Sequence, residues 1–288
     1  MDKSFDYAII GGDKRLVYVA CMLTQKDFKV ITYGMDTNNN DYLIAASLEE
    51  AVINSKNIIC PIPLTRDNIN ISSNNPSKNA RHDLALDVLA RTLDESHSFF
   101  AGCIPEFFTE YTKENGTFVY DFMKNEELTI YNTIATAEGA IAEAIKYQPN
   151  NLHGSNCLVL GFGRCSKTLS AKLKGLSASV TVCARNKSAL AEANTYGYKT
   201  LLLSDIEKHI ASYDYIFNTV PSAILSDEAL TLINKDALLA DIAPGGFDFE
   251  KSRDLKLNSH LSLGLPGKYS PKSSAEILVD VIIDVKRT

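Results

Sequence analysis

A chain of 288 residues, 45% of them hydrophobic, is long enough for two ordinary domains with real cores, which excludes disordered and fibrous proteins. Its formal net charge of −6 offers no attraction to a nucleic acid or an anionic membrane surface, so we expect neither as a partner. The six cysteines form no CxxC or Cys/His cluster, and the amino terminus has no signal-like apolar run. We therefore expect a reduced, cytosolic protein without a metal site.

Short apolar runs alternate with helix-length amphipathic stretches, which predicts parallel strands joined by helical crossovers and an α/β fold. In the first half the predicted strands are Tyr7–Ile10, Lys29–Thr32, Asn57–Cys60, Ser98–Ala101 and Thr129–Tyr131. Helices are predicted near Arg15–Gln25 and Ala80–Leu93, and the Asn- and Ser-rich stretch Asp67–Asn79 is predicted to be a surface loop. We expect residues 1–133 to form a Rossmann-like substrate or partner domain.

The segment Asn132–Tyr147 has Ala, Ile and Glu at helical spacing and predicts a long connecting helix that carries the domain hinge. The regular alternation after it predicts a doubly wound Rossmann domain over residues 134–271. The predicted strands are Asn156–Leu160, Ser179–Cys183, Thr200–Leu203, Tyr215–Thr219, Ala237–Asp241 and Leu261–Leu263. The predicted helices are Lys167–Leu173, Lys187–Tyr196, Asp205–Ile210, Ser226–Leu232 and Ser273–Val285. An alternative for residues 272–288 is that they pack back on the first domain.

The most informative motif is a glycine turn in LVLGFGRCS, where a strand runs into Gly161-x-Gly163-x-x-Ser166 and then a helix. Gly161 permits the tight turn, and Gly163 lets the backbone approach a pyrophosphate. The amides of Arg164, Cys165 and Ser166 would then point at the anion, aided by the helix dipole. The turn predicts a dinucleotide site.

The residue about 20 positions past such a turn distinguishes NAD from NADP, because an acid there bonds the free ribose 2′-hydroxyl. This strand ends without an acid and continues into Arg185, Asn186, Lys187 and Ser188. Two cations suit a 2′-phosphate, so we predict NADP(H). A basic loop that is merely solvated is the alternative.

Two further strand ends face the same crevice, NTVPS at 218–222 and DIAPGG at 241–246. We expect them to line the ribose and nicotinamide, although turn formation alone would also explain their composition. The residues concerned are Thr219, Val220, Pro221 and Ala243.

Several segments together resemble the family of dipicolinate synthase A subunits: GGDKR, IYNTIATAEGAIAEAI, LHGSNCLVLGFGRCSKTLSAKL, FNTVPSAIL and GLPGKYSPKSSAEIL. The resemblance covers nearly the whole chain. It implies NADP-dependent oxidation of dihydrodipicolinate to pyridine-2,6-dicarboxylate in the mother cell of a sporulating bacterium, together with a flavoprotein-like B subunit. The chain departs from the family at Ser166, where glycine is common, and at Ala135, where we expect proline.

A dicarboxylate substrate needs two anion-binding groups, and three stretches are candidates. Their residues are Gly12, Asp13 and Arg15; Pro266, Gly267, Lys268 and Ser273; and Asn132, Thr133 and Thr136. Capped helix starts would explain the first two stretches equally well. The candidates for proton transfer are Glu138 and Lys268, although Glu138 is more simply a first-turn carboxylate favoured by the helix dipole.

Two alternatives remain beside the dehydrogenase. One is a sensor or scaffold subunit that binds NADP without catalysis. The other is a NADP oxidoreductase like shikimate dehydrogenase, with another small carboxylate as substrate. The sequence leaves open whether the chain forms a homo-oligomer.

Overall fold

The computed structural model describes residues 3–35, 42–74, 84–243 and 245–285. The chain divides into two units, which we call unit 1 (Met1–Tyr131 with Ser270–Thr288) and unit 2 (Asn132–Tyr269). Each holds a six-stranded parallel sheet, in the orders β3-β2-β1-β4-β5-β6 and β12-β11-β10-β7-β8-β9. Both orders are the 3-2-1-4-5-6 arrangement of dinucleotide-binding sheets. The predicted α/β class with two Rossmann-type sheets is therefore confirmed.

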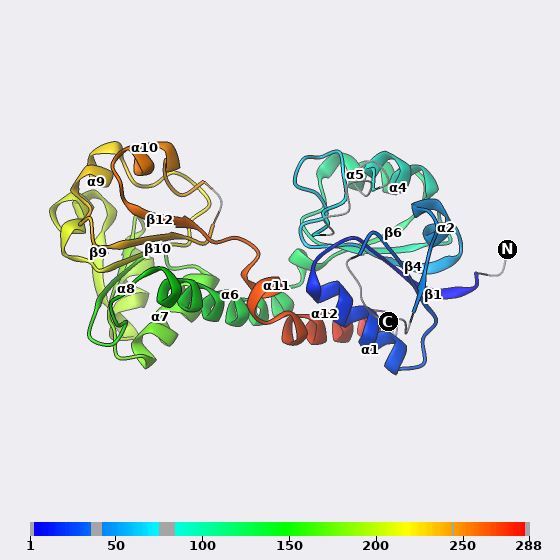
Figure 1. Cartoon of the computed structure of the whole chain (residues 1–288), viewed down its shortest axis with the longest axis horizontal. Helices are drawn as coiled ribbons and strands as arrows, with labels where there is room; N and C mark the ends of the chain where they lie inside the picture. Colours follow the sequence, from blue (N-terminus) through cyan, green and yellow to red (C-terminus); the bar gives the residue numbers. More distant parts are fainter. Residues whose placement is uncertain (1–2, 36–41, 75–83, 244, 286–288) are drawn as a thin grey trace. The chain divides into compact units, whose positions relative to one another are not determined.

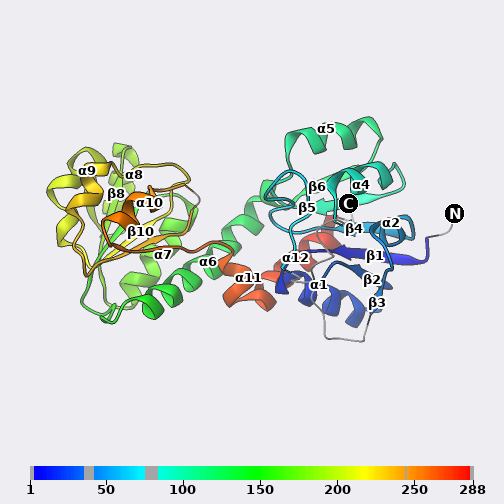
Figure 2. The ribbon, with the colours of Figure 1, turned by 45° about the horizontal axis from the view of Figure 1, so that its top comes forward.

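Unit 1 is a three-layer structure in which helices cover both faces of the sheet (Figure 1, Figure 2). Its strands are β1 Phe5–Ile10, β2 Val30–Tyr33, β3 Leu43–Ile44, β4 Ser55–Ile59, β5 Ser98–Ala101 and β6 Phe118–Asp121. Its helices are α1 Lys14–Gln25, α2 Leu48–Ile53, α4 Leu86–Thr92, α5 Glu106–Glu114, the 3₁₀ helix η1 Phe122–Lys124 and α12 Pro271–Val285. Helices α1 and α12 pack together on one face, and α2, α4 and α5 cover the other.

Unit 2 has the same layers. Its strands are β7 Asn156–Leu160, β8 Ser179–Ala184, β9 Lys199–Leu202, β10 Tyr215–Asn218, β11 Leu238–Asp241 and β12 Asn258–Leu261. Its helices are α6 Glu126–Tyr147, which begins in unit 1, α7 Arg164–Gly175, α8 Lys187–Thr195, α9 Asp227–Leu232, α10 Phe249–Asp254, α11 Leu265–Tyr269 and the 3₁₀ helices η2 Leu203–Lys208 and η3 Ile210–Ser212. One apolar core joins α6, α7, α8 and α11 to the sheet, and a second joins α9 and the 3₁₀ helices to its other face.

The structure corrects several predicted elements. Thr129–Tyr131 is not a strand but part of α6, and Asp205–Ile210 is mostly 3₁₀ rather than α-helix. The sequence reading missed β3, α2, α5, β6, α10 and α11. Residues 75–79 of the predicted loop and 80–83 of the predicted helix lie outside the described residues.

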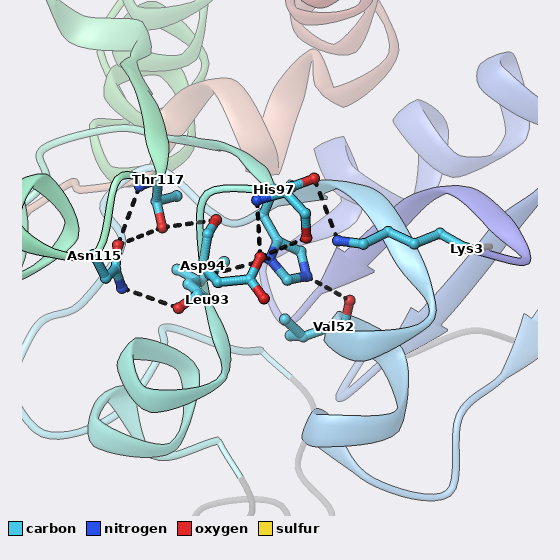
Figure 3. A network of polar contacts seen from close by, with 8 residues as sticks. Lys3, Val52, Leu93, Asp94, His97, Asn115 and Thr117 are labelled. Carbon is cyan, nitrogen blue, oxygen red and sulfur yellow. Dashed lines mark hydrogen bonds and ion pairs between the residues drawn. The ribbon is translucent and has the colours of Figure 1, made fainter. Parts of the chain in front are cut away.

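A buried histidine ties together the amino-terminal ends of two strands in unit 1 (Figure 3). His97 lies just before β5, with Nδ1 2.7 Å from Asp94 Oδ1 and Nε2 3.1 Å from the Val52 carbonyl. Thr117, just before β6, donates its hydroxyl to the Asp94 carbonyl at 3.1 Å. Ligands of parallel α/β sheets collect at the opposite, carboxyl edge, so we assign this network to the stability of the sheet.

Within the described ranges, no helix is long and apolar enough to cross a membrane. Nor does that part of the chain hold a group of three or more His, Cys, Asp or Glu side chains that could bind a metal ion.

Candidate dinucleotide site

The glycine turn of unit 2 joins the inner strand β7 to α7. Gly161 has φ +94°, and its N–H donates to the Cys183 carbonyl at 2.8 Å. A Cβ on Gly161 would lie 2.8 Å from Val220 Cγ2 and 2.9 Å from Thr219 Oγ1. Positive φ and this close approach both require glycine here.

The start of α7 is open to a ligand. Gly163 is the N-cap residue, and it makes no side-chain cap, while the Ser166 hydroxyl bonds back to the Gly163 carbonyl at 2.9 Å. A Cβ built on Gly163 meets nothing within 4 Å. A helix start that no side chain caps, beside open space at a glycine, suits the pyrophosphate of a dinucleotide.

The end of β8 lies beside this turn, because Leu160 pairs with Cys183 in the parallel register. Arg185 and Lys187 follow it and are exposed. Asn186 caps α8 by accepting bonds from the Ser188 amide and hydroxyl, both at 2.8 Å. The structure thus gathers the basic residues predicted for a 2′-phosphate next to the glycine turn.

The loops after β10 and β11 lie at the same carboxyl edge. They carry the residues predicted to line the nicotinamide half of the cofactor, Thr219, Val220, Pro221 and Ala243. The Thr219 hydroxyl donates to the Leu160 carbonyl at 2.7 Å, which holds the β10 loop against β7.

Sequence reasoning missed two polar side chains at these strand ends. Asn218 and Asp241 are fully buried and bonded to each other at 2.7 Å. Burial raises the pKa of Asp241 above its usual range, although hydrogen bonds from Asn218 and two backbone amides oppose that shift. An acid that ends the apolar run ALLAD was the available signal, and it was read as part of a turn.

Both candidates for proton transfer are ion-paired. Glu138 on α6 bonds Lys172 at 2.8 Å, and Lys268 on α11 bonds the buried Glu143. The hydrogen bond to Glu143 raises the pKa of Lys268, so the ammonium stays protonated at neutral pH. Lys268 is therefore suited to bind a carboxylate rather than to accept a proton.

The other predicted substrate residues of unit 2 lie on α6 and α11. Thr133 bonds the Thr168 hydroxyl at 2.7 Å, and the Thr136 hydroxyl donates to the Asn132 carbonyl at 2.9 Å. Pro266 and Gly267 are buried in α11. Ser273 belongs to unit 1 and is exposed in the first turn of α12.

The amino-terminal turn of unit 1 borders a cavity of about 390 Å³. Gly12, Asp13 and Lys14 line it together with apolar atoms of Val17 and Tyr18. The predicted anchor Arg15 is buried and not part of that lining. Its guanidinium bonds both Asp13 carboxylate oxygens, at 2.8–3.1 Å, and the Ile62 carbonyl at 2.7 Å.

In unit 1, backbone groups of residues 72–74 and the Asp13 side chain already bond the turn between β1 and α1. The Gly12 N–H donates to the Ser72 carbonyl at 2.7 Å, and the Asn74 N–H donates to the Gly12 carbonyl at 2.9 Å. The Asp13 carboxylate caps α1 by accepting from the Arg15 amide at 2.9 Å. The start of α7 in unit 2 has no such side-chain cap.

Comparison with known proteins supports this division. Residues 6–123 match the model of the N-terminal domain of the dipicolinate synthase A subunit, and residues 127–248 match that of the NAD-binding domain of D-isomer specific 2-hydroxyacid dehydrogenases. The dipicolinate synthase A subunit of Bacillus subtilis is 28% identical over 281 residues, which are 96% of this chain and 93% of that protein. The chain is thus similar, along nearly its whole length, to dipicolinate synthase A subunits, as its sequence motifs predicted.

Two crystal structures of this family have the same fold. The dipicolinate synthase A subunit from Bacillus halodurans superposes with a TM-score of 0.84 at 26% sequence identity, over 99% of this chain and 98% of that protein. The dipicolinate synthase A chain from Bacillus subtilis superposes with a TM-score of 0.81 at 27% sequence identity, over 100% of this chain and 97% of that protein. The second half of the chain thus matches a NAD-binding, dehydrogenase-type domain, and the whole chain has the fold of dipicolinate synthase A subunits.

Proposed function

We propose that the chain is a NADP-dependent dehydrogenase that oxidises dihydrodipicolinate to dipicolinate as the A subunit of dipicolinate synthase. The observation that carries the proposal is the likeness, over the whole chain, to two dipicolinate synthase A chains. Bound NADP+ would supply the hydride acceptor, and the residues of this chain would bind and orient cofactor and substrate.

The end of β8 supports NADP rather than NAD. A 2′-phosphate would gain charge-assisted hydrogen bonds from the guanidinium of Arg185 and the ammonium of Lys187. The side chains of Asn186 and Ser188 already bond each other. We therefore assign the 2′-phosphate to Arg185 and Lys187. Residues 185–188, directly after β8, include no carboxylate that could bond a free 2′-hydroxyl.

For the substrate we propose the cavity at the start of α1. Its volume of about 390 Å³ falls in the usual range for small-ligand pockets. The exposed Lys14 ammonium would bind one carboxylate, and Val17, Tyr18 and Met35 would contact the ring. Gly12 and Asp13 stay in the proposed site, and Arg15 orients Asp13 through their ion pair.

Lys268 of unit 2 is proposed as an alternative carboxylate anchor to Lys14, because its side chain is half exposed and protonated. Pro266, Gly267, Ser273, Asn132, Thr133 and Thr136 remain candidates beside it.

The proposal is tested by mixing the purified chain with dihydrodipicolinate and NADP+ and following the near-ultraviolet absorbance of NADPH. We expect NADPH to form, NADH to form more slowly when NAD+ replaces NADP+, and no reduced cofactor to form with the variant Gly163→Val. Cofactor binding without NADPH formation, also after addition of the B subunit, would contradict the proposal.

A non-catalytic NADP-binding subunit is the second candidate. The observation that favours it is that both proton-transfer candidates, Glu138 and Lys268, are held in ion pairs. The same assay distinguishes the two functions. Shikimate and related carboxylates in that assay test the third candidate, another small-carboxylate oxidoreductase.

We also propose that the chain works with a flavoprotein-like B subunit in the mother cell of a sporulating bacterium. The subunit designation of its relatives supports a complex with another chain. Light scattering of the chain alone and mixed with the B subunit would give both the homo-oligomeric state and the complex.

A further inference from the structure

The ends of β10 and β11 are joined by a side-chain pair that the glycine turn does not explain. Asn218 Nδ2 donates to Asp241 Oδ1 at 2.7 Å, and both residues are fully buried. Asp241 also accepts the amide of Ala243 at 3.1 Å and that of Gly246 at 3.0 Å. The carboxylate therefore holds the amides of Ala243 and Gly246, which follow β11, in place.

Asn218 holds the neighbouring loop in the same way. Its Oδ1 accepts the Val220 amide at 3.1 Å, and its Nδ2 donates to the Val220 carbonyl at 2.9 Å. A side-chain amide has donors and an acceptor, so one asparagine fixes the 219–221 turn and also reaches Asp241.

The two loops also contact each other directly. The Ile224 amide donates to the Gly246 carbonyl at 3.2 Å. A Cβ on Gly246 would overlap the Asn218 amide nitrogen and lie 2.8 Å from Asp241 Oδ2. The backbone therefore wraps the pair so closely that no other residue fits at Gly246.

Burying a carboxylate is costly unless hydrogen bonds compensate. At Asp241 the compensation comes from Asn218 at the end of β10 and from the amides of Ala243 and Gly246, which follow β11. The buried carboxylate is compensated only while these three donors are in place. It therefore stabilises one particular arrangement of the residues that follow β10 and β11 at the carboxyl edge.

We infer that Asn218 and Asp241 are positioning residues for the nicotinamide half of the cofactor. The pyrophosphate is assigned to the β7 turn and the 2′-phosphate to the end of β8, on one side of it. The ends of β10 and β11 lie on the other side of β7, where the remaining half of a dinucleotide extends. The inference rests on the cofactor placement proposed above, and the pair acts through the turn 219–221 and through Ala243 and Gly246.

The test compares Asp241→Asn with the parent chain, using NADP+ and 2′,5′-ADP, a fragment that lacks the nicotinamide. Asparagine keeps the volume but presents an NH₂ group where the carboxylate accepts a backbone N–H. We expect NADP+ affinity to fall roughly tenfold or more, since one buried bond is lost and a donor is left unpaired. The affinity for 2′,5′-ADP should stay within about twofold.

Two further variants make the comparison specific. Asp214→Asn is a matched control, because Asp214 accepts the Asn156 amide at 2.7 Å at the opposite end of β10. It should leave both affinities unchanged. Asn218→Ser removes the bonds to Val220 and to Asp241 but leaves the two backbone amides on the carboxylate. It should cause a smaller loss of NADP+ affinity, which keeps the inference testable if Asp241→Asn fails to fold.

Equal losses for both ligands, or no loss for NADP+, would overturn the inference and leave the NADP proposal intact. A parent chain that binds ADP and NAD+ but not 2′,5′-ADP would instead contradict the NADP proposal. The same comparison would then be made with NAD+ and ADP, and the expected pattern is unchanged.

Discussion

The carboxylate of Glu143 accepts a hydrogen bond from the Tyr269 hydroxyl at 2.5 Å. Lys268 adds an ion pair to the same oxygen. Both donors lie on α11 and Glu143 lies on α6, so the three side chains fasten α11 to α6. Gly139, one turn earlier on α6, permits this approach, because a Cβ there would lie 2.8 Å from Leu265 Cβ.

Glu143→Gln should lower the free energy of unfolding by about 1–3 kcal/mol at neutral pH, measured by denaturant titration. Burial alone would raise the pKa of Glu143, but bonds from Lys268 and Tyr269 bring it below 4.5. Because the pKa of Glu143 is lower in the folded than in the unfolded chain, its ionised carboxylate stabilises the fold above pH 4.5. That stabilisation is lost as the pH falls through the lowered pKa of the folded state.

The stability difference between parent and variant should therefore shrink below pH 4.5. Glu192→Gln is the control, because its ion pair with Lys167 is partly exposed on both sides and should contribute only about 0–1 kcal/mol. A difference that is constant with pH would mean that the charge of Glu143 does not matter.

Replacing Arg185 with Asp should reverse or abolish a preference for NADP(H) over NAD(H). The change removes a charge-assisted pair and adds repulsion, together roughly 2–4 kcal/mol or more than tenfold in affinity. Calorimetric titration of both cofactors measures it, and Arg253→Asp makes the same charge change on α10 as a control. Equal affinities of the parent chain for NADP and NAD would refute the preference.

Gly163→Val should abolish dinucleotide binding and leave the fold intact. The added side chain enters open space in the protein, but it occupies the space assigned to the pyrophosphate. Gly175 at the other end of α7 also has nothing within 4 Å, so Gly175→Val is a matched control that should bind cofactor normally. If the folded Gly163→Val variant kept its affinity, the pyrophosphate would have to lie elsewhere.

At the unit 1 cavity, Lys14→Ala should lower kcat/KM roughly tenfold through loss of a charge-assisted bond, with stability unchanged. Arg15→Ala should lower kcat/KM roughly tenfold to a hundredfold and also cost about 3–5 kcal/mol of stability, because Asp13 loses its partner. NADP affinity should stay within about twofold in both variants. Steady-state kinetics, cofactor titration and thermal unfolding measure these effects. If both variants kept the kcat/KM of the parent chain, Lys14 and Arg15 would not bind the substrate, and Lys268 would be the next candidate.

Much of the fold was predictable because the hydrophobic periodicity and the positions of turn-forming residues indicate the same elements along the chain. β5 and β7 were predicted with their observed bounds. The strand predicted at Thr129–Tyr131 was wrong, because its β-branched and aromatic residues follow a strong helix start: Asn125 Oδ1 accepts the Leu128 amide at 2.9 Å. Capping outweighed local strand propensity there.

The polar contacts of the site were less predictable, because they join residues far apart in the chain. Asn218 and Asp241 are 23 residues apart, and Glu143 and Lys268 are 125 apart. Neither pair has a spacing motif, unlike the turn from Gly161 to Ser166. The sequence does show that apolar strand-forming segments end in polar residues. Which polar residues then bond each other depends on the order of the strands in the sheet.

The carbonyl of Ser72, placed against the amino-terminal glycine turn, bears on how many nucleotides the molecule can hold. Two sheets of one topology suggest two equivalent nucleotide sites. In unit 1, however, the Ser72 carbonyl oxygen already accepts the hydrogen bond of the Gly12 amide. A free nucleotide would have to displace that oxygen together with the Asp13 cap. We therefore expect one dinucleotide per chain.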